Sequence, residues 1–308
     1  MTNQIPFPAT TSAQTLYPLQ YIEELNYGTL ITASPQYVPV EIAGDITPTR
    51  DAVEIEVGQS GSYYNYASQS AGHDYSFTMD IKPTKIGIMK YGADPITNPA
   101  TLQFARAQKR ALGTNYLNTM YEFWLGAKCN SLTLSTTARD LASASMEFFC
   151  RDFTIENTAS GLTTPDFTLF SEITDPVISN VDSDYLPFTF NGTPRAVQDF
   201  TITWNNNLAR VNLVGSEQGL TEQIVLGHIG VTGSWTEIVG RDTVMETMVH
   251  DFPQVAVNAK MKFKAANCFA SITGLKITSM DRPIPSQPGE PLTNTMNFTA
   301  ISATLTTS

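Results

Sequence analysis

The sequence contains three histidines, the residue type that most often ligates zinc or moves protons near neutral pH. His73, His228 and His250 lie far apart in the chain. None of them takes part in an HxH or HExxH spacing, which would place two imidazoles on one face of a strand or helix. We therefore expect no metal site.

Carboxylates could carry acid and base chemistry, and Asp199, Glu237 and Asp242 are the candidates. They are scattered along a chain rich in strand patterns, where isolated acids are usually solvated. No GxSxG, P-loop or GxGxxG motif occurs. The sequence therefore predicts no enzyme and no cofactor.

Cys129, Cys150 and Cys268 form no CxxC pair, so neither a disulfide framework nor a zinc site is indicated, and buried thiols in a reducing cytosol are expected. The N-terminus lacks the pattern of a secretion signal, and no run of 18 apolar residues occurs. We expect no membrane association.

The formal net charge is −11, and only 15% of the 308 residues are charged. A protein that grips DNA needs a basic footprint, which this chain lacks. A conduit that lets phosphates pass would instead favour a neutral or negative wall, although ordinary solubility explains the charge equally well. The length allows one large domain or two smaller ones.

The elements that these residues occupy read mainly as strands. Residues 1–36 form a Pro-rich arm, whose apolar side chains Ile5, Phe7 and Tyr17 could contact a neighbouring subunit. Two strands are expected between Tyr37 and Val57. The Gly-, Ser- and Tyr-rich stretch 58–74 predicts a long hairpin loop, and a floppy surface loop is an equally good interpretation.

Three tyrosines in that stretch offer large contact areas at low entropic cost, as recognition loops do. We interpret them as candidates for contact between subunits or stacked rings: Tyr63, Tyr64 and Tyr66. Further on, Pro99, Leu102, Phe104 and Gly113 match the start, apolar face and stop of a helix, so a helix is predicted over 99–112.

Residues 128–155 carry the clearest pattern in the chain. Cys129, Leu132 and Leu134 alternate with small polar residues, a polar link follows, and Ala142 to Cys150 alternate again. This pattern predicts a β-hairpin with one apolar face, which needs a second sheet or a neighbouring subunit to cover it.

The second half repeats the order of strands, helix and further strands. Strands are expected around 200–204, 231–236, 255–263, 272–277 and 295–305, and a short helix over 241–251. The repetition predicts a first domain at 37–156, a linker at 157–185 and a second domain at 186–308. The expected fold is all-β with minor helix, as two tandem β-sandwich or barrel domains that each carry one short helix.

Two passages resemble the tail tube proteins of double-stranded DNA phages. One is the NSLTLS strand with its returning strand that ends in Arg151-Asp152, and the other combines Phe200 to Leu208, Leu213 to Ser216 and Val231 to Trp235. Val214 inside the second passage departs from the family pattern at a turn. The resemblance covers about a quarter of the chain.

The resemblance implies a structural subunit of a viral tail tube, assembled in the host cytoplasm and located in the virion. Rings of this family contain six tube domains, so two domains per chain favour a homotrimer with pseudo-hexameric symmetry over a hexamer. The implied partners are copies of the same chain, the tape measure protein and phage DNA in the lumen, and the tail terminator and distal tail proteins at the ends.

The alternative is a β-sandwich module of a virion that binds a receptor or carbohydrate through the loop of Tyr63 to Tyr66. Such a module would be a monomer or compact trimer with measurable affinity for a sugar, whereas a tube subunit would form rings or filaments.

Overall fold

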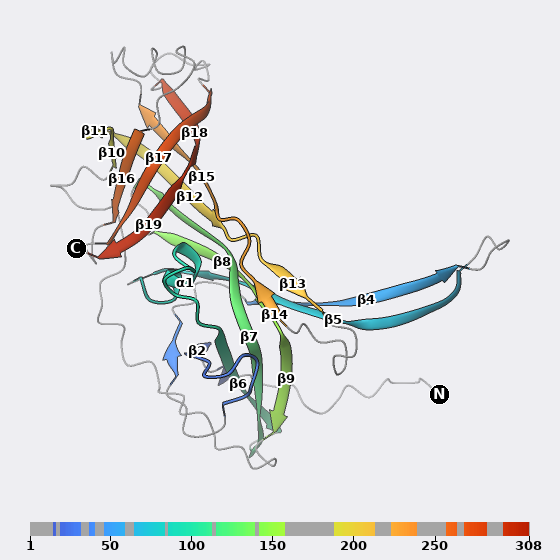
Figure 1. The fold of residues 1–308 in the computed structure, drawn as a ribbon. Helices are drawn as coiled ribbons and strands as arrows, with labels where there is room; N and C mark the ends of the chain where they lie inside the picture. Colours follow the sequence, from blue (N-terminus) through green and yellow to red (C-terminus); the bar gives the residue numbers. More distant parts are fainter. Residues whose placement is uncertain are drawn as a thin grey trace, which may run out of the picture.

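The computed structural model describes residues 15–16, 19–31, 37–40, 46–58, 65–83, 86–112, 115–138, 142–157, 188–212, 223–238, 257–263, 268–281 and 292–307. Regular structure in this part of the chain is almost entirely β-strand, with a single 3-10 turn and a single short α-helix (Figure 1). The predicted all-β fold with a minor helical component is therefore confirmed. Within the described ranges, no helix is long and apolar enough to cross a membrane.

The N-terminal half supplies the first group of strands and the helix. They are β1 (Thr15–Leu16), β2 (Gln20–Glu23), β3 (Val38–Pro39), β4 (Thr47–Gly58), β5 (Asn65–Ile81), the 3-10 helix η1 (Gly87–Met89), α1 (Lys90–Ala93), β6 (Leu102–Leu112), β7 (Asn115–Thr137), β8 (Ser143–Cys150) and β9 (Asp152–Asn157).

The C-terminal half supplies the second group. It comprises β10 (Phe188–Phe190), β11 (Thr193–Arg195), β12 (Val197–Asn205), β13 (Ala209–Val211), β14 (Gln223–Val225), β15 (Gly230–Ile238), β16 (Val257–Phe263), β17 (Cys268–Asp281), β18 (Thr293–Ala300) and β19 (Ser302–Thr307).

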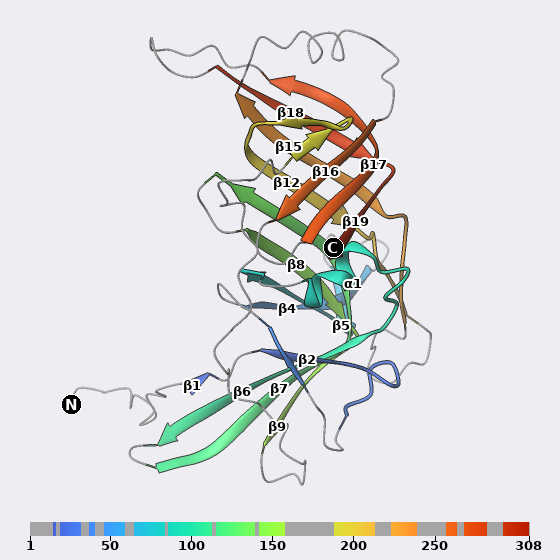
Figure 2. The ribbon, with the colours of Figure 1, turned by 90° about the vertical axis from the view of Figure 1, so that its left-hand side faces the viewer.

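One antiparallel sheet runs through both halves, in the order β4-β5-β8-β7-β12-β15-β18-β17, and we call it the central sheet. Figure 2 shows β12, β15 and β18 continuing the layer that β8 and β7 begin. The two halves thus share one hydrogen-bonded layer through the pairing of β7 with β12.

Each half also has a flank sheet that packs on the central sheet. The first flank sheet joins β1 and β2 to β6, β7 and β9, and the second joins β11, β10, β16, β17 and β19. The long strands β7 and β17 belong to both layers of their halves, so each half is a sandwich folded around one bent strand.

Aromatic side chains fill the space between the layers of each half. In the first half, the ring centroid of Phe104, from the flank sheet, lies 4.9 Å from the ring centroids of both Phe77 and Phe148 of the central sheet. In the second half, the ring centroids of Phe188 and Trp235 are 5.1 Å apart. These rings are buried, and the edge-to-face and tilted geometries are those that aromatic pairs prefer.

A glycine with positive φ marks the bend in each long strand. Gly126 has φ of 64° and Gly274 has φ of 68°. A Cβ atom at Gly126 would lie 2.8 Å from Cβ of Arg151, and one at Gly274 would lie 2.5 Å from Cδ1 of Ile301. Only glycine accommodates both the backbone conformation and the close approach.

The N-terminal segment is tied to the first bend through Glu24. Its carboxylate accepts hydrogen bonds from the Gly126 amide at 2.7 Å, the Gly28 amide at 2.9 Å and the Thr101 hydroxyl at 2.7 Å. Residues 19–31 are therefore part of the first sandwich, although residues 1–36 as a whole were predicted to be an arm.

The pKa values of two adjacent carboxyls in this segment should be shifted in opposite directions from the ordinary value of glutamate. Burial raises the pKa of Glu24 above 4.5, while the Tyr91 hydroxyl and then Lys90 lower the pKa of Glu23 below 4.5. The stability contributed by Glu24 is therefore full below pH 4.5 and is lost as pH rises through its folded pKa, whereas that from Glu23 is present above 4.5 and is lost as pH falls. A carboxyl carbon-13 NMR titration of the folded protein measures both, and a Glu24 pKa at or below that of Glu23 would contradict the assignment.

The helix predicted over 99–112 is wrong, because residues 102–112 form β6. Leu102 and Phe104 are buried, and their spacing of two fits a strand as well as a helix. Pairing with β7 along the length of β6 decides between the two. Local start and stop signals are weaker than such tertiary pairing.

The long loop predicted over 58–74 is also largely wrong, because β5 begins at Asn65 and pairs with β4. In Figure 1 the β4–β5 hairpin extends well away from the two sandwiches. Gly72 (φ 148°) lies at a register shift in this ladder. The glycine and serines between residues 65 and 74 thus belong to an irregular, extended ladder, while residues 59–64 of the predicted loop lie outside the described residues.

The hairpin predicted from 128 to 155 is confirmed as β7 and β8. Leu132, Leu134, Phe148 and Cys150 are buried as their alternation predicts. The helix predicted over 241–251 and nearly all of the predicted linker, 157–185, lie outside the described residues.

Candidate functional site: the polar face and open edges of the central sheet

The face of the central sheet that points away from the aromatic cores carries hydroxyl and amide side chains across both halves. We call it the polar face, and two rungs of in-register residues define it. One rung is Asp80, Ser145, Thr133, Thr203, Thr232, Thr299 and Lys276, and the other is Ser143, Ser135, Thr201, Ser234, Asn297 and Ser279.

Hydrogen bonds link these side chains to one another across the strands. The hydroxyls of Thr133 and Thr203 are 2.9 Å apart, and Asn297 donates from Nδ2 to the Ser279 hydroxyl at 2.8 Å. These cross-strand bonds hold the small side chains in place. The polar face is therefore a hydrogen-bonding surface made mostly of short, uncharged side chains.

The charges on this face are mainly acidic. Among the described residues, the registers place these charged side chains on it: Asp51, Asp74, Asp80, Lys128, Glu147, Asp199, Lys276 and Asp281. One of the two lysines is engaged, because Lys128 donates from Nζ to the Ile224 carbonyl at 3.0 Å. Burial lowers the pKa of this ammonium. The face thus offers little positive charge to phosphates.

The two halves meet where β7 pairs with β12, which we call the internal joint. Its register runs from Ser131 opposite Asn205 to Thr137 opposite Asp199. On the core side, Leu132 lies opposite Trp204, and both are fully buried. Trp204 also donates from Nε1 to the Ala303 carbonyl at 2.8 Å. The internal joint thus combines a ladder, a polar face and an apolar core.

Asn206 closes the end of the internal joint. Its backbone amide donates to the Asn130 carbonyl at 2.8 Å, and its Nδ2 donates to the carbonyls of Gly92 at 3.1 Å and Cys129 at 2.9 Å. The side chain is fully buried. One residue therefore connects β12 to both α1 and β7.

The ribbon of β13 and β14 braces the second half against the first. Arg210 lies in β13. Its guanidinium donates to the Tyr75 carbonyl at 2.7 Å and lies 3.5 Å from the Asp74 carboxylate. Its guanidinium sits 4.1 Å from the centroid of the Phe149 ring. These contacts fix the ribbon on β5 and β8 at one end of the polar face.

Two strands of the central sheet have an edge without a partner strand in the described part of the chain. β4 pairs with β5 on one side, and the Lys276–Asp281 portion of β17 pairs with β18 on one side. Thr47 to Asp51 are exposed, as are Ser279 and Asp281. Open edges of a sheet offer unused backbone donors and acceptors to another strand.

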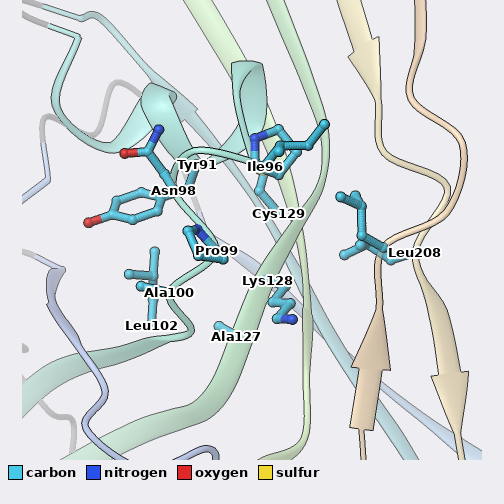
Figure 3. Close-up of a pocket in the computed structure, with 12 residues that line it drawn as sticks. Tyr91, Ile96, Asn98, Pro99, Ala100, Leu102, Ala127, Lys128, Cys129 and Leu208 are labelled. Carbon is cyan, nitrogen blue, oxygen red and sulfur yellow. The ribbon is translucent and has the colours of Figure 1, made fainter.

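A pocket of about 250 Å³ lies beside the internal joint (Figure 3), with mainly apolar walls. Pro99, Ala100 and Leu102 line one side, and Leu208 faces them from the second half. Lys128 and Cys129 both line it, but burial raises the pKa of the Cys129 thiol, and the Lys128 ammonium donates to the Ile224 carbonyl. The pocket therefore suggests no catalytic reaction.

Most residues predicted to contact other subunits lie outside the described residues: Ile5, Phe7, Tyr17, Tyr63 and Tyr64. Tyr66 lies in β5, within the β4–β5 hairpin. Their roles in contacts remain a prediction. Sequence reasoning missed both open edges, although Pro48, Arg50 and Asp51 inside a strand are a signal typical of edges.

The described candidates do not converge on one site: Asp199 and Glu237 lie on neighbouring strands, but Asp199 is on the polar face and Glu237 is buried. His73 lies beside Tyr75 in β5, Asp199 is in β12 and Glu237 is in β15, while His250 and Asp242 lie outside the described residues. Within the described ranges no group of three His, Cys, Asp or Glu could hold a metal.

Two of the cysteine thiols, Cys129 and Cys150, are buried and free. Burial raises the pKa of both thiols, so neither is a reactive thiolate at neutral pH.

The sequence was compared with models of known protein families and with curated proteins. A family model described as phage tail tube protein matches residues 18–300, which is nearly the whole chain. A search of curated proteins finds no match. The family match spans both halves and the internal joint.

Proposed function

The chain belongs to the phage tail tube protein family and is a structural component of a virion tail, and we propose that its copies close into rings that stack around a DNA channel. The observation that carries this proposal is the central sheet, which has a complete joint in its middle and, among the described strands, an open edge at each end. Copies of such a chain can pair edge to edge, either without limit as an open chain of subunits or until they close into a ring.

The first support is that the two halves repeat the same pairing scheme. In β7, Cys129 lies opposite Phe148, the ladder then skips Asn130, and Ser131 lies opposite Glu147. In β17, Ile277 lies opposite Phe298, the ladder skips Thr278, and Ser279 lies opposite Asn297. In both halves the bulge therefore follows directly after the pair that contains the buried phenylalanine, Phe148 or Phe298.

The corners of the two halves repeat in the same way. The Arg151 amide donates to the Leu125 carbonyl at 2.9 Å, and the Ile301 amide donates to the Thr273 carbonyl at 3.1 Å. Each acceptor immediately precedes the bend glycine of its strand, Gly126 or Gly274. On this basis we assign one tube domain to residues 37–156 and a second to 186–308.

Two tube domains per chain lead to a ring of three chains. Six equivalent units around an axis would give pseudo-sixfold symmetry, with three joints inside chains and three joints between chains. A hexamer of this chain would place twice as many units in one ring. We therefore favour the trimer.

We assign the polar face to the wall of the channel. Closing the central sheet into a cylinder leaves one face inside, and the flank sheets with their cores occupy the other face. Short hydroxyl side chains and scattered carboxylates give phosphates no cationic site to bind. DNA could then move along the wall without being held.

Further partners follow from a place in the tail. The tape measure protein would occupy the lumen before DNA does, and the tail terminator and distal tail proteins would contact the end rings. The β4–β5 hairpin extends from the sandwiches (Figure 1) and would reach an adjacent ring. Assembly in the host cytoplasm agrees with buried thiols that need no oxidation.

Electron cryo-microscopy of the purified protein at increasing concentration tests the proposal. We expect rings of three two-lobed chains that stack into tubes, with Thr203 and Thr232 on the inner wall. Small particles at every concentration, combined with measurable sugar binding, would instead support a receptor-binding module. Tubes with a basic inner wall would refute the channel assignment.

A further inference from the structure

The internal joint provides a template for the joint between chains. The strand pairings of the two halves can be aligned residue by residue. Phe77 pairs with Phe148 in the first half, and Gly233 pairs with Phe298 in the second. From this anchor, residues 49–51 of β4 and 74–77 of β5 each have one counterpart in β12 or β15.

The counterparts at the β4 edge follow from three consecutive pairs. Thr49, Arg50 and Asp51 lie opposite Ser76, Tyr75 and Asp74. Their counterparts Thr203, Trp204 and Asn205 lie opposite Thr232, Val231 and Gly230. The open edge of β4 therefore corresponds to the portion of β12 that forms the internal joint.

The counterparts at the β17 edge follow from the shared bulge. Ser279 and Met280 lie opposite Asn297 and Met296, as Ser131 and Leu132 lie opposite Glu147 and Met146. Asp281 then corresponds to Thr133. The open edge of β17 is thus the counterpart of the β7 portion of the internal joint.

We propose that β17 of one chain pairs antiparallel with β4 of the next, with Ser279 opposite Asp51, Met280 opposite Arg50 and Asp281 opposite Thr49. This inference rests on the proposed function, since it gives the register by which the proposed ring closes. The same register is seen inside the chain, where Ser131, Leu132 and Thr133 lie opposite Asn205, Trp204 and Thr203.

The side chains suit this register. In the internal joint the hydroxyls of Thr133 and Thr203 form a hydrogen bond of 2.9 Å, and their counterparts are the Asp281 carboxylate and the Thr49 hydroxyl. The Ser279 hydroxyl accepts from Asn297 at 2.8 Å, which leaves its proton to donate to Asp51. Both contacts would be charge-assisted hydrogen bonds.

The position of a proline also agrees with the register. Pro48 corresponds to Ile202, which lies opposite Leu134 in the internal joint. The partner of Pro48 would therefore be the position after Asp281, which is the last described residue of β17. The three proposed pairs, at Thr49, Arg50 and Asp51, thus involve no residue without an N–H group.

The differences between the two joints explain how a chain with open edges can stay separate before assembly. Arg50 stands where the internal joint has the buried Trp204, and it is exposed, with its guanidinium 5.7 Å from the Tyr75 ring. A charged residue and a proline on an edge oppose uncontrolled pairing. Closure of a complete ring would then supply the remaining contacts.

Disulfide crosslinking in tubes of the full chain tests the register. The Asp51→Cys and Ser279→Cys pair, in a Cys268→Ser background, should crosslink between chains upon oxidation, because directly opposed residues have the short Cα separation that a disulfide needs. Non-reducing gels should show dimers and then a closed trimer as the final product. The Ser131→Cys and Asn205→Cys pair is the positive control and should crosslink within one chain.

The Thr49→Cys and Ser279→Cys pair is the register control. These residues are diagonal in the proposed ladder, so this pair should crosslink only in traces. Tubes in which the Thr49 pair crosslinks and the Asp51 pair does not would overturn the register. Tubes in which neither pair crosslinks would overturn the β17–β4 joint.

A strand-resolved map of wild-type tubes gives the same answer if the cysteine variants fail to assemble, and a register other than Ser279 opposite Asp51 would refute the inference. Failure of the wild-type chain to form tubes is a different result, because it would contradict the proposed function itself.

Discussion

Replacing Gly126 with alanine should lower the free energy of unfolding by about 2 to 5 kcal/mol, through left-handed backbone strain together with overpacking. The glycine has φ of 64°, and an added Cβ would meet Cβ of Arg151 and a ring carbon of Tyr27, each at 2.8 Å. The Arg151 Cβ is held close to the backbone at the sandwich corner, so it cannot easily move away. Thermal or denaturant unfolding measures the loss.

Gly192→Ala is the matched control for that substitution. Gly192 has φ of 75°, but a Cβ there meets no atom within 4 Å, so only the backbone strain of about 1 to 2 kcal/mol should appear. Gly274→Ala should fall between the two, because the nearest atom is the end of the Ile301 side chain. Equal losses at all three positions would show that the corner contacts do not matter.

Converting Asn206 to aspartate should cost about 3 to 5 kcal/mol of stability near neutral pH, since it leaves a buried charge uncompensated. The amide now donates to two carbonyls, of Gly92 and Cys129, and a carboxylate there would face both oxygens with no donor. The loss should also weaken the connection between the halves. Unfolding of the variant and its ability to form tubes are the measurements.

The exposed neighbour Asn205 provides the control, because Asn205→Asp makes the same chemical change in solvent and should cost less than about 1 kcal/mol. The pH dependence gives a second check. Burial raises the pKa of an introduced carboxyl, so the Asn206→Asp deficit should shrink as pH falls from that raised pKa toward the pKa of an unfolded aspartic acid, about 4, and should be smallest below it. A deficit that is the same for both variants would contradict the role of Asn206 in the joint.

The parts of the fold that the sequence predicts are those set by local alternation. Leu132, Leu134 and Phe148 alternate with small polar residues, and each is buried in the β7–β8 hairpin as expected. The failure at residues 102–112 has a physical cause. Leu102 and Phe104 fit either period, and only the long partner strand β7 selects the strand.

Alternation does not predict the open edges, because an edge is defined by which distant strand is missing, although Pro48, Arg50 and Asp51 are a local signal of the edge at β4. Thr133 and Thr203 are far apart in the chain, yet they form one rung of the internal joint. The bulge at Asn130 and its repeat at Thr278 likewise emerge only from the register. Sequence alternation indicates which face of a strand is apolar, but it does not tell which edge is left unpaired.

The ladder between β7 and β12 has a kinetic consequence for the proposed assembly. Each association of separate molecules loses translational and rotational freedom, at an estimated cost of roughly 4 to 15 kcal/mol. A covalent connection makes the meeting of two neighbouring units intramolecular, at a high effective concentration. A ring of three double-length chains would therefore need fewer collisions than one of six single units, and it would nucleate at a lower protein concentration.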